Sequence, residues 1–262
     1  MKSRLAQFSE DPLRREQYVD FICRRTFRRT LLCHGEVTLN RALPLELLST
    51  FFFTTSAKPV SAQPDLHSTA VEEFRTNENV AISPYRPLAK AALAVLSELH
   101  PRPIKLDRLW ELIQARLGET LREDSGSRSE GSQLLAQFLF QCFLSNLVEL
   151  QMHVSAFVTE VSERPLATPL ARLQASADSR VTNRRHRGIE LGTFDRLVLR
   201  HLDGSLDQAA LLDILIKMVE KGDWKIEKEA MSIQDPAQVC AMLTETLDRC
   251  LHSLARSTLL VG

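Results

Sequence analysis

One order of predicted elements occurs twice in this 262-residue chain, and that repetition constrains its fold more than any other feature. In the first copy a helix from Leu88 to Leu99 ends at "HPRP", and a second helix opens at Leu106. In the second copy a helix from Thr193 ends at "DGS", and the next opens near Leu206. The dipeptide Leu-Asp opens both second helices. Each copy then predicts an insertion, a third helix and a strand, an order typical of winged-helix domains.

The third helices differ in character. Residues 133–146 are apolar nearly all round and predict a buried helix, preceded by a polar loop, "REDSGSRSEGS". In the second copy Ser205 and Gln208 form a capping-box pattern, residues 222–235 predict a hairpin, and Pro236 opens the last helix. We therefore expect winged-helix-like units at residues 88–163 and 188–262. Prolines and small residues at 164–187 indicate a linker lying over a surface.

Residues 1–87 mix helix and strand signals. Asp11 and Pro12 open a predicted helix over Asp11–Arg24, with Tyr18, Phe21 and Ile22 on one face. Residues 26–39 predict a strand and then a turn. Residues 44–57 predict a helical turn leading into a strand, and residues 71–83 a short hairpin. The predicted fold class is α+β, mostly helical, with a small α+β N-terminal part followed by the two winged-helix-like units.

Composition narrows the function classes. Lys+Arg and Asp+Glu are 33 each, a formal net charge of +0 that argues against nucleic acid and anionic membranes as partners. No apolar run is long enough for a transmembrane helix, and the first residues lack the apolar region of a signal peptide. The five cysteines form no CxxC pair, which fits free thiols in the cytoplasm.

Basic residues gather in two places, and these are the candidate interaction residues. The first group is Arg24, Arg25, Arg28 and Arg29, with His34 close behind, and the second is Arg184, Arg185, His186 and Arg187. A solvated or salt-bridged surface is the alternative interpretation of both groups. His34 follows Cys33 directly, and adjacent strand residues point to opposite faces, so this pair predicts no metal site.

Chemical motifs offer no candidate for catalysis or cofactor binding. The sequence contains no G-x-G-x-x-G, G-x-S-x-G or H-E-x-x-H pattern, and "GSRSEGSQ" lacks the lysine of a phosphate-binding loop. The predicted helix at 133–146 has no basic residue, which favours packing over DNA recognition.

Four segments together are distinctive: "EQYVDFICRRTFRRTLLCHGEV", "AFVTEVSERPLATPLARLQA", "VTNRRHRGIEL" and "HLDGSLDQAALLDIL". From about Gln17 to its end the chain resembles the accessory region of a family of bacterial S-adenosylmethionine-dependent methyltransferases. That region is a methyltransferase regulatory domain followed by a winged-helix C-terminal domain. The family includes protein lysine methyltransferases that modify outer-membrane proteins. Arg29 and Arg185 depart from the family, which tends to have glutamine and an apolar residue there.

The resemblance does not extend to the family's catalytic domain, so it carries over no catalytic or donor-binding residue. It implies a non-catalytic regulatory and scaffolding module that docks with a methyltransferase domain or its protein substrate. No cofactor is then expected in this chain, and S-adenosylmethionine is expected only in a partner or missing catalytic domain. Methyltransferase activity in this chain itself and nucleic-acid binding through the arginine groups are the alternatives, and homodimerisation stays open.

Overall fold

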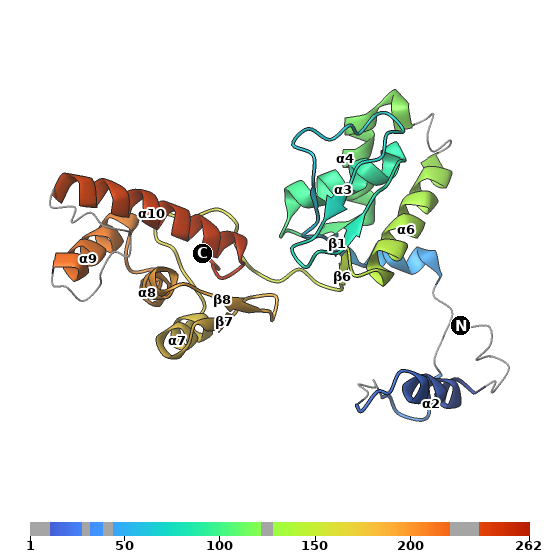
Figure 1. Cartoon of the computed structure of the whole chain (residues 1–262), viewed down its shortest axis with the longest axis horizontal. Helices are drawn as coiled ribbons and strands as arrows, with labels where there is room; N and C mark the ends of the chain where they lie inside the picture. The colour runs from blue at the N-terminus through green and yellow to red at the C-terminus, as the bar shows by residue number, and fades with distance from the viewer. Residues whose placement is uncertain (1–10, 28–31, 39–43, 122–127, 221–235) are drawn as a thin grey trace. The chain divides into compact units, whose positions relative to one another are not determined.

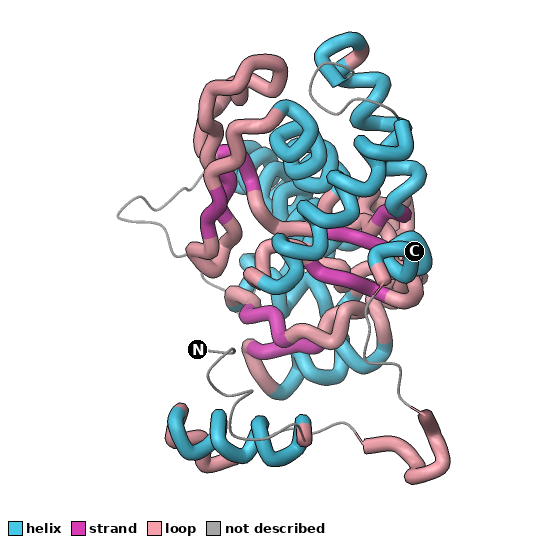
Figure 2. Tube along the Cα trace, turned by 90° about the vertical axis from the view of Figure 1, so that its right-hand side faces the viewer, coloured by secondary structure: helices cyan, strands magenta, loops and turns pink. Residues whose placement is uncertain are grey.

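The computed structural model describes residues 11–27, 32–38, 44–121, 128–220 and 236–262 (Figure 1). The chain forms two compact units, Met1–Leu43 and Pro44–Gly262. Helices form about half of the described trace, and the strands are only two or three residues long (Figure 2). The predicted fold class, α+β and mostly helical, is confirmed.

The first unit contains one described helix, α2 (Pro12–Ile22), which begins where the sequence predicts. The Asp11 carboxylate accepts a hydrogen bond from the backbone N–H of Leu13 at 2.9 Å. After the helix ends, Arg24 adopts a φ of 50°. Of the strand predicted over residues 26–39, the described parts, 26–27 and 32–38, contain no strand, and the remainder lies outside the described residues.

The second unit has two hydrophobic cores, and we name the parts around them the first lobe (residues 44–151) and the second lobe (residues 158–262). In the first lobe the 3-10 helix η1 (Leu45–Thr50) leads into strand β1 (Phe52–Thr54), as predicted. Strand β1 lies between β5 (Ile104–Lys105) and β6 (Glu149–Gln151) and is antiparallel to both. The central strand of this sheet thus precedes the helices of the lobe in sequence, whereas each edge strand comes directly after a helix.

A second small sheet in the first lobe contains β2 (Lys58–Pro59), β3 (Phe74–Arg75) and β4 (Ala81–Ile82). Strands β3 and β4 form the hairpin that the sequence predicts. Its turn holds Asn79 at a φ of 63°, a left-handed conformation that asparagine tolerates better than most residues.

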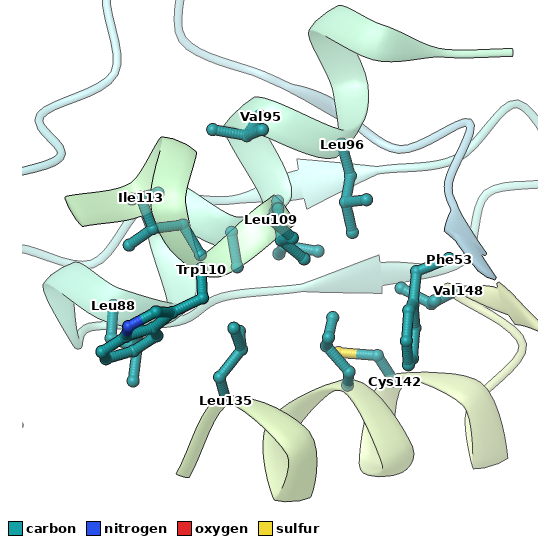
Figure 3. Close-up of a cluster of buried hydrophobic side chains, with 14 of the residues drawn as sticks. Phe53, Leu88, Val95, Leu96, Leu109, Trp110, Ile113, Leu135, Cys142 and Val148 are labelled. Carbon is teal, nitrogen blue, oxygen red and sulfur yellow. The ribbon is translucent and has the colours of Figure 1, made fainter. Parts of the chain in front are cut away.

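Three helices complete the first lobe: α3 (Pro87–Leu99), α4 (Leu106–Leu117) and α6 (Arg128–Leu144). Alanines let α3 pack closely on several sides, and it is buried from Pro87 to Leu96. Figure 3 shows α6 directing Leu135 and Cys142 into the core below α4. The prediction that this third helix is buried is wrong along one face, where Gln133, Gln137 and Gln141 are exposed, and at its end, where Phe143 and Leu144 are 38% and 60% exposed.

Lys90 is a buried charge that the sequence analysis missed. Its side chain on α3 is fully buried, and its ammonium group donates to the backbone carbonyls of Asp65, Ser68 and Ala70, the last two at 2.8 and 3.0 Å. An ammonium group has three donors, so these three carbonyls satisfy it completely. Lys90 therefore holds the 65–70 loop against α3.

The second lobe contains α7 (Pro169–Ala177), β7 (Arg180–Thr182), β8 (Gly188–Glu190), α8 (Thr193–His201), α9 (Gln208–Glu220) and α10 (Pro236–Arg256). Strands β7 and β8 form an antiparallel hairpin. Leu166 bridges Asp203, which follows α8, and Ala167 bridges Leu260, which follows α10. Residues 166–167, which precede the helices of this lobe, thus lie between two segments that each follow a helix. Strand β1 has the same position in the first lobe.

Residues 164–187 differ from the linker that their composition indicates. They form α7 and β7, and they bury Ala171, Ala175 and Val181 in the second core. Small residues are found there because α7 packs closely against α8, not because the segment is loose. The hairpin predicted at 222–235 lies outside the described residues.

The start of α9 also differs from its prediction. Asp207 accepts from the N–H of Ala210 at 2.8 Å, in place of the predicted cap at Ser205, which hydrogen-bonds to Asp203 instead. Both residues belong to the same polar turn, and local sequence alone does not rank them as caps.

Candidate functional site

The first predicted arginine group lies in the N-terminal unit. Arg24 and Arg25 are exposed, and Arg25 lies 3.6 Å from the Asp20 carboxylate. Arg28 and Arg29 lie outside the described residues. The carbonyl of His34 accepts from the N–H of Val37 at 3.1 Å in an exposed turn. Among the described residues no three His, Cys, Asp or Glu side chains form a group that could hold a metal ion.

The second predicted group occupies the turn between β7 and β8, and Asn183 builds that turn. Its side-chain oxygen accepts from the N–H groups of Arg185 and Arg187 at 2.9 and 3.0 Å, and its side-chain nitrogen donates to the carbonyl of Ser257 at 3.0 Å. His186 takes a φ of 56° at the turn. Asn183 therefore fixes both the turn and its attachment to the end of α10.

Two arginines of this turn share one carboxylate of the first lobe. The guanidinium of Arg185 pairs with Glu149, and Arg187 donates to the other oxygen of Glu149 at 2.7 Å. Arg185 has a side chain only 9% exposed, so its charge is compensated inside the protein. Arg184 donates to the carbonyl of Ala156 at 3.0 Å. The structure thus uses two of the four residues of this predicted interaction group, Arg185 and Arg187, to join the lobes.

A polar cleft of about 920 Å³ lies beside this junction. Its first-lobe wall is Ser56, Lys58, Asn77, Ser97, Glu98 and His100. The opposite wall is the charged face of α10, with Glu245, Asp248, Arg249, His252, Ser253, Arg256 and Ser257. Most of these charges lie three or four residues apart along α10 and so share one face of the helix.

Each carboxylate of the cleft lies beside a basic side chain of the protein. Glu98 accepts two hydrogen bonds from Arg116, at 2.8 and 2.6 Å. Arg249 donates to Glu245 at 3.0 Å, and His252 lies 3.4 Å from Asp248.

Two cations in the cleft are not compensated in this way. Among the described residues no carboxylate forms an ion pair with Lys58 or Arg256, and these two side chains are exposed. Because the two residues come from opposite walls, the cleft presents uncompensated positive charge from both sides.

His100 closes one part of the first-lobe wall in its neutral form. Burial lowers the pKa of this imidazole from its ordinary value, and the positive charges of Arg185 and Lys58 lower it further. Glu149 acts in the opposite direction. The ring nitrogen of His100 lies 3.5 Å from the hydroxyl of Thr54. The histidine is therefore available as a hydrogen-bond partner without adding charge near neutral pH.

A smaller pocket of about 420 Å³ adjoins the cleft, and Ser56 lines both. Its apolar side includes Phe143, Val80 and Leu150, and its polar side includes Glu78, Glu149 and Arg187. Glu78 is 76% exposed and lies 3.9 Å from Arg187. This pocket therefore combines an aromatic ring with carboxylates, while the residues that line the larger cleft are all polar or charged.

Sequence analysis found one edge of this site and missed its centre. It named Arg185 and Arg187 but not Lys58, His100 or Arg256. The available signal was the row of charges on α10, which is not among the candidate interaction residues of the sequence analysis. No local sequence pattern indicates that this row of charges faces Lys58, which lies almost two hundred residues away along the chain.

Comparisons with family models identify two regions of the chain. Residues 163–259 match the model "PKMT, C-terminal winged helix domain". Residues 1–34 match the model "Predicted methyltransferase regulatory domain". Both matches confirm the resemblance to the accessory region of these methyltransferases, and they confirm a winged-helix domain at the C-terminus.

Two uncharacterized proteins of Rickettsia prowazekii are curated relatives. One is 27% identical over 258 residues, which is 96% of this chain but only 45% of that protein. The other is 28% identical, over 93% of this chain and 100% of that protein. The chain therefore spans about half the length of the first relative and the whole length of the second.

The fold also matches PKMT2 from Rickettsia typhi, with a TM-score of 0.81 and 24% identity over 100% of this chain and 52% of that one. A second structure, PKMT2 in complex with AdoHcy, gives a TM-score of 0.80 and 23% identity over 100% and 51% of the two chains. The expectation that S-adenosyl ligands belong only to a partner or a missing domain is contradicted by this complex, whose protein includes the whole fold of this chain.

Within the described parts of the chain, no helix combines the length and the apolar character that a membrane span requires.

Proposed function

Because residues 163–259 carry the C-terminal winged-helix domain of protein lysine methyltransferases, we propose that this protein works in the S-adenosylmethionine-dependent methylation of protein lysines, and that it contacts the S-adenosyl ligand itself. The observation that carries the proposal is the fold match to PKMT2 in its AdoHcy complex, which extends over 100% of this chain. The methyltransferase activity in this chain, one of the alternatives open from sequence, is thereby favoured over a purely non-catalytic module.

The smaller pocket offers side chains that suit such a ligand. A nucleoside needs an apolar or aromatic surface for its base and acceptors for its ribose hydroxyls. Phe143 would contact the base, and Glu78 would accept from the hydroxyls. When bound, S-adenosylmethionine supplies an electrophilic methyl group on its sulfonium. The sequence contains no glycine-rich donor loop, so binding has to be measured before turnover.

Titration calorimetry of the chain with S-adenosylhomocysteine tests this proposal. We expect saturable one-to-one binding that Phe143→Ala weakens about tenfold, since a base-stacking contact contributes about 1–3 kcal/mol. Leu144→Ala is the matched control, because Leu144 is a neighbouring exposed apolar residue that does not line the pocket. Transfer of a radiolabelled methyl group from S-adenosylmethionine to protein lysines is the second readout. Absence of binding heat and of label transfer would reject the proposal.

A regulatory role is the second candidate, favoured by the match of residues 1–34 to a regulatory-domain model. In that role the exposed Arg24 and Arg25, with Arg28 and Arg29, dock a methyltransferase domain or its protein substrate. Replacing all four arginines with glutamate should abolish co-sedimentation with such a domain. The double variant Arg200→Glu/Lys217→Glu changes exposed cations on the second lobe and should leave docking intact. Unchanged docking of the first variant would reject this role.

A further inference from the structure

The large cleft is long and open enough for a polymer rather than a compact ligand. Its α10 wall runs from Glu245 to Ser257, and at 1.5 Å per residue that wall is about 18 Å long. An extended peptide advances about 3.3 Å per residue, so about five or six residues match this length. The adjoining pocket at Ser56 continues the path.

The lining of the cleft selects a hydrophilic occupant. Its side chains are serines, an asparagine, histidines and charged groups, and no aromatic or large aliphatic side chain is among them. An apolar ligand would therefore gain little from burial here, whereas the backbone of a peptide finds hydrogen-bond partners throughout.

The uncompensated positive charges of the cleft favour a negatively charged occupant. Glu98 and Glu245 are paired with Arg116 and Arg249, and Asp248 lies 3.4 Å from His252, while Lys58 and Arg256 have no carboxylate partner among the described residues. We propose that this cleft binds an extended acidic peptide segment, with a carboxylate of that segment bridging Lys58 and Arg256. The inference rests on the proposed function only in that the segment would belong to the protein substrate.

Nucleic acid fits the same cleft less well, although it is also an extended anion. Lys58 and Arg256 are the two cations of the cleft without a carboxylate partner among the described residues, whereas a phosphate backbone carries a charge on every nucleotide. Among the described residues, the lining of the cleft also contains no Phe, Tyr or Trp ring on which single-stranded bases could stack. A peptide avoids both difficulties because its charges are separated by neutral backbone.

Fluorescence anisotropy of the full chain with a labelled peptide tests the proposal. The probe is a peptide of about six residues that alternates glutamate and serine, matching the length of the cleft. We expect saturable binding that weakens as NaCl is raised. A lysine-serine peptide of the same length and a single-stranded oligothymidine should bind more weakly than the acidic peptide.

The decisive variant is Lys58→Glu/Arg256→Glu, for which we expect affinity for the acidic peptide to fall about tenfold, as the summed effect of two reversed surface charges. Arg200→Glu/Lys217→Glu makes the same change in net charge on α8 and α9, outside the cleft, and should bind like the unmodified chain. Circular dichroism melts of both variants confirm that folding is retained.

Three results would overturn the proposal: equal affinity of the two double variants, preference for the oligothymidine, or displacement of the peptide by inorganic phosphate at an ionic strength where NaCl does not displace it. The last result would identify a small-anion site instead of a peptide site. None of these measurements contains an S-adenosyl ligand, so failure here leaves the calorimetric test of methylation unaffected, and the reverse also holds.

Discussion

The two lobes of the second unit share a plan but are stabilised differently. In each lobe an upstream segment lies between two segments that follow helices. In the first lobe Phe53 occupies that segment and pairs with residues on both sides in a continuous sheet. In the second lobe Ala167 occupies it, and only isolated bridges form. The same topology is therefore compatible with two kinds of stabilisation. The first lobe has a sheet with a large buried aromatic residue at its centre, and the second lobe depends mainly on the packing of its helices.

Each lobe also fixes a loop with one buried polar side chain. Lys90 does so in the first lobe by donating to three carbonyls. Asn183 does so in the second lobe with one donor and one acceptor atom. A buried charge is harder to replace than a buried amide, since its solvation is costlier to lose. The first lobe should therefore be the more sensitive of the two to a single substitution.

The largest expected effect is that of Phe53→Ala. Phe53 is fully buried at the centre of the first core, and its truncation should lower the free energy of unfolding by about 3–5 kcal/mol. Ala167→Gly at the equivalent place should cost about 1 kcal/mol or less. Urea unfolding followed by far-ultraviolet circular dichroism reports the helices of both lobes. Similar losses for both substitutions would contradict the comparison.

Lys90→Met should be the next most damaging change. It keeps the aliphatic stem but leaves the carbonyls of the 65–70 loop without their donor, at a cost of about 2–4 kcal/mol. Hydrogen exchange of residues 65–70 should accelerate more than that of α4. Lys105→Met removes an exposed lysine of the same lobe and serves as the control. Protection of the loop that survives Lys90→Met would show that the loop is held by other contacts.

Glu149→Gln tests how far the lobes depend on each other. Removing this charge leaves the poorly exposed Arg185 without its carboxylate, which should cost about 1–3 kcal/mol. Calorimetric melting should then resolve two transitions further apart than in the unmodified chain. The pair between Arg102 and Glu160 is far more exposed, so Glu160→Gln should change little. A single unchanged transition after Glu149→Gln would mean that the pair does not couple the lobes.

Asn183→Ala should cost about 1–2 kcal/mol, because it removes the acceptor for two N–H groups of the turn and the donor to Ser257. Asn183→Asp keeps the acceptor alone and should give an intermediate loss. Thermal melting of both variants measures the difference. Equal melting temperatures for the two would assign the whole effect to the donor.

The smallest expected effect concerns acid sensitivity, and the lobes share it. His100 follows α3 and His201 ends α8, and burial lowers the pKa of both imidazoles from 6.5. A lowered folded pKa gives stability that is present above the unfolded pKa and is lost as pH falls below it. The melting temperature should therefore decrease as the pH is lowered below about 6.5. This decrease should be smaller in the double variant His100→Gln/His201→Gln. An identical pH profile in the double variant would contradict this origin.

Local signals in the sequence determined much of the fold. Apolar residues at helical spacing placed α3, α4, α8 and α10, and Asp11 with Pro12 placed the start of α2. The repeated order of helices was also legible, because periodicity, caps and breaks depend on neighbours along the chain. The resemblance of the chain to a methyltransferase accessory region followed from the same local segments.

Only the tertiary structure decided which segments lie together. Small residues such as those at 164–187 occur both in linkers and in tightly packed helices, so their composition does not distinguish the two. The structure shows that they are small here because α7 packs closely against α8. Lys90 looks like a surface lysine until the 65–70 loop covers it. The cleft combines Lys58 with Arg256, and no local pattern relates residues so distant in sequence. Long-range contacts of this kind depend on the complete packing arrangement, and so the candidate site could not be predicted from the sequence although its helices could.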